Sequence, residues 1–181
     1  MEQTQSKDTQ TAYEDHPDKG MVIDKLEELG IQYKIFEHEP VFTVEQGLHL
    51  HDIIPGGHCK NLFLKDKKGE LWLISAIEST KIDLKKIEPL IASARLSFAS
   101  PERLEENLKV KPGSVTPFAL IHDEYNKINV ILDSNLFDYE QVNFHPLHNH
   151  ESLMLTPNDL VLYIKAVGYQ PKIVDLSGKS Y

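Results

Sequence analysis

The chain has little of what builds disulfide-rich or membrane-spanning proteins. Its 181 residues include one cysteine, which excludes an internal disulfide framework and gives no sign of an oxidising compartment. No stretch approaches the roughly 18 consecutive apolar residues that indicate a transmembrane helix. The polar start, residues 1–10, lacks the apolar core of a signal peptide. We therefore expect a cytoplasmic protein of one domain, long enough to bury a sizeable core.

Positive charge is also scarce. The chain has 19 Lys and Arg against 28 Asp and Glu, a formal net charge of −9. General nucleic-acid binders need clustered Lys and Arg to contact phosphates, so this balance argues against that class and against a DNA partner. The end of an RNA needs only one local basic cluster. Such clusters occur at Lys65, Lys67 and Lys68, at Lys81, Lys85 and Lys86, and at Lys109 and Lys111.

The two ends of the chain differ from its middle. Residues 1–20 are Gln- and Thr-rich and carry too few apolar side chains to offset the entropy of ordering them. We expect a disordered tail over residues 1–20, one folded domain over residues 21–176, and a short C-terminal tail over residues 177–181. No internal repeat is recognisable.

Capping patterns predict where the helices of the domain begin and end. Apolar residues at helical spacing predict a helix from Met21, and Gly30 stands where a left-handed C-terminal cap belongs. Polar N-caps, two of them followed by proline at the first helical position, predict further helix starts. These caps are Thr43, Asp83, Ser100 and Thr156.

Short apolar runs between the helices predict strands. Residues 62–64 and 71–74 flank a turn in which Gly69 can take a positive φ, so they predict a hairpin. Short strands mixed with several helices are typical of an α+β domain. The other expected strands are residues 32–37, 118–121, 128–132, 141–144, 152–155 and 172–174.

The strongest functional signal is the run Gly-Gly-His-Cys-Lys-Asn at residues 56–61, which leads into an apolar strand. Two adjacent glycines let the backbone approach a ligand closely. A lysine at the strand mouth, Lys60, supplies three donors and a charge that burial can retune. The local sequence alone leaves open a plain turn followed by an ordinary surface lysine.

Three more motifs occur in a fitting order: Arg-Leu-Ser-Phe-Ala-Ser at residues 95–100, Gly-Ser-Val-Thr-Pro at residues 113–117, and Asn-Phe-His-Pro at residues 143–146. With the glycine-lysine run, they make the chain over about residues 21–176 resemble the YbaK/prolyl-tRNA synthetase editing-domain family. Within it, the chain is similar to the free-standing branch that deacylates alanyl-tRNA(Pro). The resemblance implies an α+β fold in which a curved, barrel-like mixed sheet is surrounded by helices.

The resemblance also implies a catalytic site. Lys60 matches the family's essential lysine, which would hold the aminoacylated ribose and stabilise the transition state before acting as a base. Asn61 would add amide groups beside it, unless it satisfies backbone groups. His145 would orient the substrate or a water near neutral pH, unless it lines the core. The implied substrate-binding residues are Gly113, Ser114, Val115, Thr116, Pro117 and Asn149.

Two other chemistries have less support in the sequence. His145, His148 and His150 suggest a metal site, but their proline-bearing loop has no rigid helical face and no evident acidic or thiolate partner nearby. We expect neither a metal nor another cofactor. Cys59 could be a thiolate nucleophile. Neighbouring strand side chains face opposite ways, so Cys59 would point into the packing if Lys60 points into the site.

The leading hypothesis is a trans-editing enzyme that hydrolyses mischarged alanyl-tRNA(Pro). Its partner would be aminoacylated tRNA(Pro), with prolyl-tRNA synthetase or translation factors as further partners and no membrane. The same reaction on cysteine or serine stays open, because pocket dimensions cannot be read from a sequence. Two different functions also stay open: a non-catalytic module that binds tRNA or a synthetase, which Lys60 argues against, and a metal-dependent hydrolase.

Overall fold

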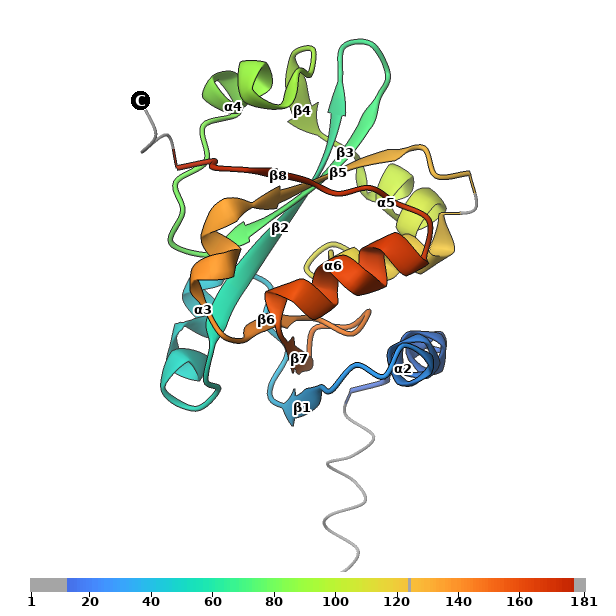
Figure 1. Cartoon of the computed structure of the whole chain (residues 1–181), viewed down its shortest axis with the longest axis vertical. Coiled ribbons are helices and arrows are strands. Elements are labelled where there is room, and N and C mark those ends of the chain that lie inside the picture. Colours follow the sequence, from blue (N-terminus) through green and yellow to red (C-terminus); the bar gives the residue numbers. More distant parts are fainter. Residues whose placement is uncertain (1–12, 124, 178–181) are drawn as a thin grey trace, which may run out of the picture.

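The structure is a computed structural model that describes residues 13–123 and 125–177. It contains an eight-stranded mixed sheet with helices packed around it (Figure 1), which confirms the predicted α+β class. The strands are β1 (Lys34–Glu37), β2 (Gly57–Asp66), β3 (Leu71–Ile77), β4 (Leu96–Phe98), β5 (Ile128–Asp133), β6 (Val142–Phe144), β7 (Glu151–Leu155) and β8 (Lys172–Val174). The helices are α2 (Lys19–Glu28), α3 (Val44–Gly47), α4 (Leu84–Ile91), α5 (Pro101–Leu108) and α6 (Pro157–Ala166), with 3-10 helices η1 (Leu48–Asp52), η2 (Pro117–His122) and η3 (Ser134–Asp138).

Strand β2 joins the two halves of the sheet, whose order is β1-β7-β6-β2-β3-β5-β8. One edge of β2 pairs with β3 in an antiparallel ladder. Its other edge pairs first with β6, in parallel at Gly57 and His58, and last with β4, from Leu64 to Asp66. Between these two partners, residues 59–62 have no strand beside them in the described part of the chain. A stretch of strand edge is therefore open near the centre of the sheet.

Two apolar cores cover the two faces of the sheet. Because side chains alternate along a strand, Phe63 and Leu73 enter one core and Leu64 and Ile74 enter the other. The larger core includes residues of α2, α5, η2 and α6, whereas α4 packs on the smaller one. All seven residues of β3 are consequently buried.

Helices α3, α4, α5 and α6 begin at the polar caps that the sequence indicates. Ser100 and Thr156 accept hydrogen bonds from backbone N–H groups at 3.2 and 3.1 Å, with proline next in each helix. Thr43 accepts from the N–H of Gln46 at 3.2 Å, and the Gln46 side chain accepts from the N–H of Phe42 at 3.0 Å. Among residues 13–123 and 125–177, no helix has the length and apolar character needed to cross a membrane.

One expected strand is wrong. Residues 118–121 form part of the 3-10 helix η2 rather than a strand. Thr116 caps this helix by accepting from the N–H of Phe118 at 3.3 Å, and Pro117 supplies a pre-set φ at its first position. Phe118, Ala119 and Leu120 are buried and Ile121 is partly exposed. An apolar run without polar alternation gives no period that distinguishes strand from helix.

The expected disorder over residues 1–20 also needs correction. Residues 1–12 lie outside the described residues, as do 178–181 of the expected C-terminal tail. Residues 13–20, however, lie against the folded domain. The ammonium of Lys19 is 2.7 Å from the carboxylate of Glu151, and Asp18 is 3.0 Å from the ring of His122. Composition misses this because the segment is held by ion pairs instead of an apolar face.

Candidate functional site

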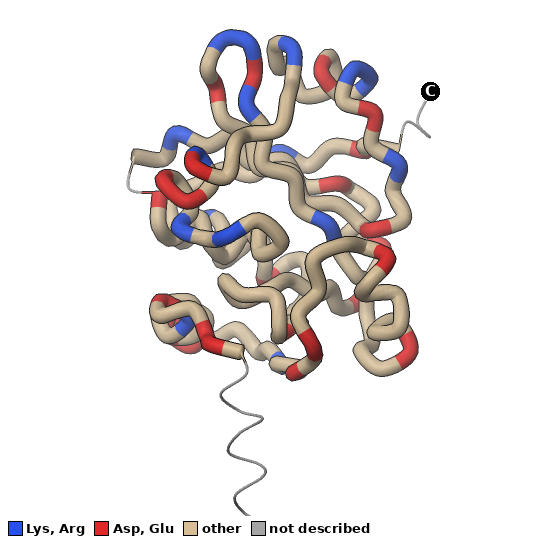
Figure 2. The backbone as a smooth tube through the Cα atoms, turned by 180° about the vertical axis from the view of Figure 1, so that it is seen from behind, with Lys and Arg blue, Asp and Glu red and all other residues tan. Residues whose placement is uncertain are grey.

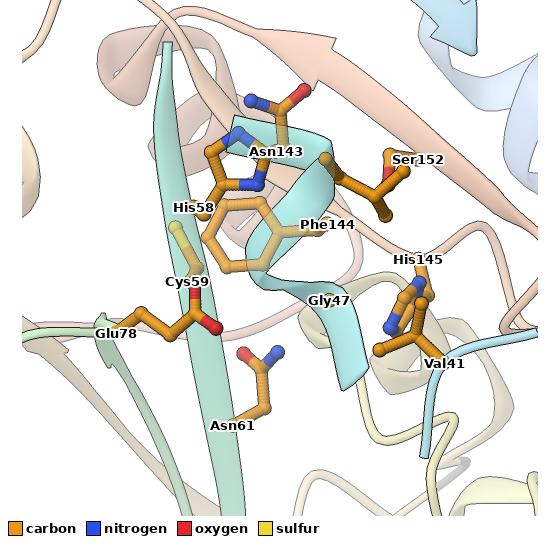
Figure 3. Close-up of a pocket in the computed structure, with 11 residues that line it drawn as sticks. Val41, Gly47, His58, Cys59, Asn61, Glu78, Asn143, Phe144, His145 and Ser152 are labelled. Carbon is orange, nitrogen blue, oxygen red and sulfur yellow. The ribbon is translucent and has the colours of Figure 1, made fainter. Parts of the chain in front are cut away.

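A hollow of about 380 Å³, which we call the cleft, lies along the open edge of β2. All four edge residues, 59–62, line it, because the cleft faces the strand from its side rather than from one face of the sheet. An inner cavity of about 60 Å³ adjoins the cleft and shares several of its lining residues (Figure 3). The shared residues are Val41, Cys59, Asn61, Glu78 and His145.

The structure brings together five of the residues expected at the site. Lys60, Asn61, Gly113, Val115 and His145 all line the cleft, although they are up to 85 positions apart in the chain. Their convergence follows from the topology, because β6 runs parallel to the start of β2 and carries His145 just beyond its end. The roles of these residues stay predictions.

Lys60 combines partial burial with a nearby pair of acids. Its ammonium donates to the backbone carbonyl of Thr80. Desolvation lowers the pKa of Lys60, and the charges of Glu78 and Asp133 act in the opposite direction. The result is a cation that is easier to deprotonate than a surface lysine. A substrate would have to compete with the Thr80 carbonyl for the ammonium.

Asn61 faces the cleft with one half of its amide free. Its oxygen accepts from the hydroxyl of Ser75 at 2.6 Å, which fixes the orientation of the group and turns the amide nitrogen outward. This nitrogen has no hydrogen-bond partner among the described residues. A preoriented N–H donor beside a reaction site is suited to stabilise a developing oxyanion.

His145 is neutral and presents a lone pair. Burial lowers its pKa to about 4, so the ring is uncharged at pH 7. Its Nδ1 lies 3.0 Å from the carbonyl oxygen of Glu151, and a carbonyl can only accept, which places the single ring proton on Nδ1. Nε2 is then an acceptor, in a ring that lines both the cleft and the inner cavity beside Val41 (Figure 3).

The expected substrate loop divides between the cleft and the core. Gly113 has a φ of +89° and a Cβ atom there would lie 3.1 Å from the Phe42 ring, so only glycine keeps this close approach. Ser114 and Asn149 line a separate hollow, and the Asn149 amide holds the Val41 carbonyl at 3.1 Å. The last two loop residues, Thr116 and Pro117, are buried and form the start of η2.

Cys59 does not point away from the site, contrary to the expectation from the alternation of side chains along a strand. It lines the cleft together with Lys60, because the cleft follows the strand edge and does not select one face of the strand. Burial strongly raises the pKa of its thiol, which keeps the nucleophilic thiolate scarce. We still expect Cys59 to be chemically inert, but the reason is the raised pKa of its thiol and not the orientation of its side chain.

Three residues of the site are absent from the sequence-based assignment. Glu78 follows β3 and lines both hollows. Asn143 donates to the carbonyls of Pro55 at 2.9 Å and Gly57 at 3.2 Å, while its own oxygen is buried without a partner in the described part of the chain. Phe42 is 63% exposed at the cleft rim. A signal was available for Asn143, which belongs to the Asn-Phe-His-Pro motif.

The histidines after β6 do have acidic neighbours, contrary to expectation. His148 and His150 lie near Glu151 and near Asp15, which belongs to the segment before α2. The long sequence separation of Asp15 hid this contact. His145 is not part of this cluster and instead lines the cleft.

Known proteins resemble this chain over most of its length. The model of the aminoacyl-tRNA editing domain family matches residues 38–162. The prolyl-tRNA editing protein ProX of Acetoanaerobium sticklandii is 41% identical over 160 residues, which cover 87% of this chain and 97% of that protein. The mouse prolyl-tRNA synthetase associated domain-containing protein 1 is 35% identical over 156 residues, covering 83% and 92%.

A solved structure has the same fold. The crystal structure of a candidate trans-editing enzyme for prolyl-tRNA synthetase superposes with a TM-score of 0.68 at 22% identity, covering 89% of this chain and 98% of that one. Together with the sequence matches, this likeness shows that the chain belongs to the aminoacyl-tRNA editing domain family.

Proposed function

We propose that the protein is a trans-editing deacylase that hydrolyses alanyl-tRNA(Pro). The observation that carries the proposal is the convergence in one cleft of a cation, a free amide donor and a neutral imidazole, from Lys60, Asn61 and His145. The names of the relatives, which refer to prolyl-tRNA editing and to prolyl-tRNA synthetase, support this substrate and suggest that enzyme as a partner.

Ester hydrolysis assigns these groups distinct roles. A water must attack the carbonyl carbon, the carbonyl oxygen becomes negative, and the ribose oxygen leaves as a hydroxyl that carries the proton given up by the water. The free amide nitrogen of Asn61 and the ammonium of Lys60 would stabilise the negative oxygen. His145 Nε2 would accept a hydrogen bond from the water and orient it, because an imidazole with a pKa of about 4 is a weak base.

The inner cavity supports a small amino acid. Its volume of about 60 Å³ is far smaller than the 380 Å³ of the cleft, and we assign it to the side chain of a small amino acid. A synthetase that binds proline discriminates poorly against a smaller residue, since each methylene contributes only about 1–3 kcal/mol. A second site that excludes the larger residue would complete the selection.

The cleft rim supports binding of a nucleic-acid end and not of an extended nucleic-acid surface. Figure 2 shows Lys and Arg interspersed with Asp and Glu over the view, without one basic face. The exposed ring of Phe42 lies between the cleft and a second hollow that is lined by Lys109 and Lys111. Stacking of the terminal adenine on Phe42, with its phosphates near these lysines, would place the ester in the cleft.

Side-by-side deacylation of tRNA(Pro) charged with alanine, cysteine, serine or proline tests the proposal. We expect alanyl-tRNA(Pro) to be cleaved fastest and prolyl-tRNA(Pro) to survive. Faster cleavage of the cysteinyl or seryl ester would reassign the amino acid. Equal rates on the alanyl and prolyl esters would exclude selection by size, and no turnover on any of them would favour a binding module. A cytoplasmic location, where aminoacyl-tRNA is used, is part of the proposal.

A further inference from the structure

A second group of side chains beside the cleft has the composition of a metal site. His51 comes from η1, His58 from the start of β2, and Glu78 follows β3, and one potential ligand atom from each lies within 4.8 Å of the other two. We propose that these three residues bind a divalent transition-metal ion, with zinc as the best match. Two imidazoles and one carboxylate are a ligand set that zinc accepts, with a fourth position left for water.

His58 is held in the protonation state that a ligand requires. Its Nε2 lies 2.9 Å from the carbonyl oxygen of Ile54. A carbonyl cannot donate, so Nε2 carries the ring proton and Nδ1 keeps its lone pair. Metal-bound histidines characteristically donate their second ring N–H to a carbonyl or carboxylate in this way, which fixes both tautomer and orientation.

His51 and Glu78 can complete the site with small movements. Their Nε2 and Oε2 atoms are 2.8 Å apart, a contact in which the ring N–H donates to the carboxylate and the lone pair is on Nδ1, and the Glu78 side chain is only 12% exposed. His51 stacks on His58 with ring centroids 4.2 Å apart. Ligand atoms around tetrahedral zinc are about 3.4 Å apart for bonds of about 2.1 Å. Rotation of the His51 ring, whose side chain is 41% exposed, would aim its lone pair at the same point.

The other histidine cluster has the same ligand types, but a lysine already pairs with its carboxylate. His148 Nδ1 accepts the backbone N–H of His16 at 2.9 Å, so the neutral ring carries its proton on Nε2, the atom nearest Glu151. The ammonium of Lys19 is 2.7 Å from the same Glu151. An ion there would have to displace a proton and a cation. At the cluster of His51, His58 and Glu78 an ion would have to displace only the N–H that His51 donates to Glu78, because no lysine or arginine pairs with this carboxylate among the described residues.

The proposed ion would lie at the wall of the inner cavity, since His58 and Glu78 line it (Figure 3). It would compensate the carboxylate of Glu78, whose charge otherwise acts on Lys60. The binding site stands on its ligands alone and does not depend on the proposed deacylase activity.

Metal titration of the purified full chain tests the inference. Zinc affinity is measured by competition with a chromophoric chelator, and cobalt is used as a probe because its visible absorption reports tetrahedral coordination. We expect one equivalent to bind the natural chain, and His51→Ala and Glu78→Gln to weaken binding at least about tenfold, as loss of a contributing group does. Melting curves of the metal-free proteins check that the variants fold.

His150→Ala is the matched control, because it removes a histidine from the second cluster. We expect it to bind zinc like the natural chain. Loss of binding in this control with retention in His51→Ala would move the ion to the second cluster and overturn the inference. Absence of stoichiometric binding to the natural chain at micromolar zinc would overturn it as well. If Glu78→Gln does not fold, His51→Ala still tests the site, because His51 is exposed and its replacement should not disturb the fold.

Discussion

The two ends of strand β2 differ in whether their polar groups have hydrogen-bond partners. At the far end, both carboxylate oxygens of Asp66 are fully used: they accept from the N–H groups of Lys68, Glu70 and Ala94 and from the Trp72 indole, at 3.0 to 3.2 Å. Burial alone would raise the pKa of Asp66, but these hydrogen bonds outweigh it and lower the pKa. This end is a closed network that stabilises a hairpin.

At the cleft end, some hydrogen-bond donors and acceptors have no partner among the described residues. The Asn61 amide nitrogen and the buried Asn143 oxygen have no partner in residues 13–123 and 125–177, and His145 has a lone pair to offer. Buried polar groups without partners cost free energy. The two ends of β2 therefore differ: the polar groups around Asp66 are satisfied within the fold, whereas several at the cleft can still bind a ligand. An unsatisfied atom alone does not identify the site, because Ser93 Oγ and Asn107 Oδ1 are also buried without a partner in the described residues and line neither hollow.

Lys60→Ala is expected to have the largest effect on activity. If Lys60 stabilises an oxyanion as proposed, its loss should lower kcat/KM by about 100-fold or more, as removal of a single oxyanion donor does. The melting temperature should stay near that of the natural chain, because the ammonium is only partly buried. Lys86→Ala, an exposed lysine on α4, is the control and should keep full activity. Near-full turnover in Lys60→Ala would contradict the assigned role.

Asp66→Ala should show the reverse behaviour at the other end of β2. It leaves four donors without their acceptor, and we expect a loss of about 3 kcal/mol of unfolding free energy with unchanged activity of the folded fraction. Because the folded pKa is lowered, this stabilisation exists above the unfolded pKa and disappears as pH falls through the folded value. Urea unfolding at several pH values measures it, with exposed Asp24→Ala as control. A variant that stays stable but turns over substrate slowly would contradict the conclusion that Asp66 contributes to stability and not to activity.

His145 should make the stability of the domain sensitive to mild acid. Between pH 6.5 and about 4 the unfolded chain binds a proton at this ring and the folded chain does not, so the unfolding free energy falls as pH drops through that window. His145→Gln should reduce the slope there. An unchanged slope in urea titrations from pH 7 to pH 4 would show that the ring is not buried neutral.

Gly69 and Gly113 have similar backbone conformations but different surroundings. Comparing them distinguishes the cost of backbone strain from an effect on activity. Gly69 has φ +87° with nothing within 4 Å of the position a Cβ atom would take, whereas at Gly113, with φ +89°, that atom would lie 3.1 Å from the Phe42 ring. Each change to alanine should cost about 1 kcal/mol from backbone strain. Only Gly113→Ala should also slow alanyl-tRNA(Pro) cleavage. Equal activities of the two variants would show that the loop at Gly113 does not take part in binding the substrate.

Lys19→Met should have the smallest effect. Lys19 pairs with buried Glu151, and its loss should cost about 1 kcal/mol, seen as a melting shift of a few degrees. Lys25→Met, whose partner Glu28 is exposed, should change stability by a few tenths of a kcal/mol at most. Identical melting temperatures would mean that residues 13–20 contribute nothing to the fold.

The sequence predicted local structure well wherever one short segment contains the physical cause. The caps at Ser100 and Thr156 define helix starts because a hydroxyl and the N–H it satisfies are three residues apart. The prediction failed at residues 118–121, where a uniformly apolar run has no period that distinguishes strand from helix. It also failed at residues 13–20, whose partners lie more than 100 positions away.

The sequence by itself determined the family and the residue types of the site, because motifs such as the run at residues 56–61 are local. Only the tertiary structure decided which of these residues share a cleft. The open edge of β2 exists because β6 and β4 pair with its two ends and leave the middle free. Strand pairing depends on contacts between distant segments. That is why Asn149 became a support for Val41 and Glu78 a part of the site.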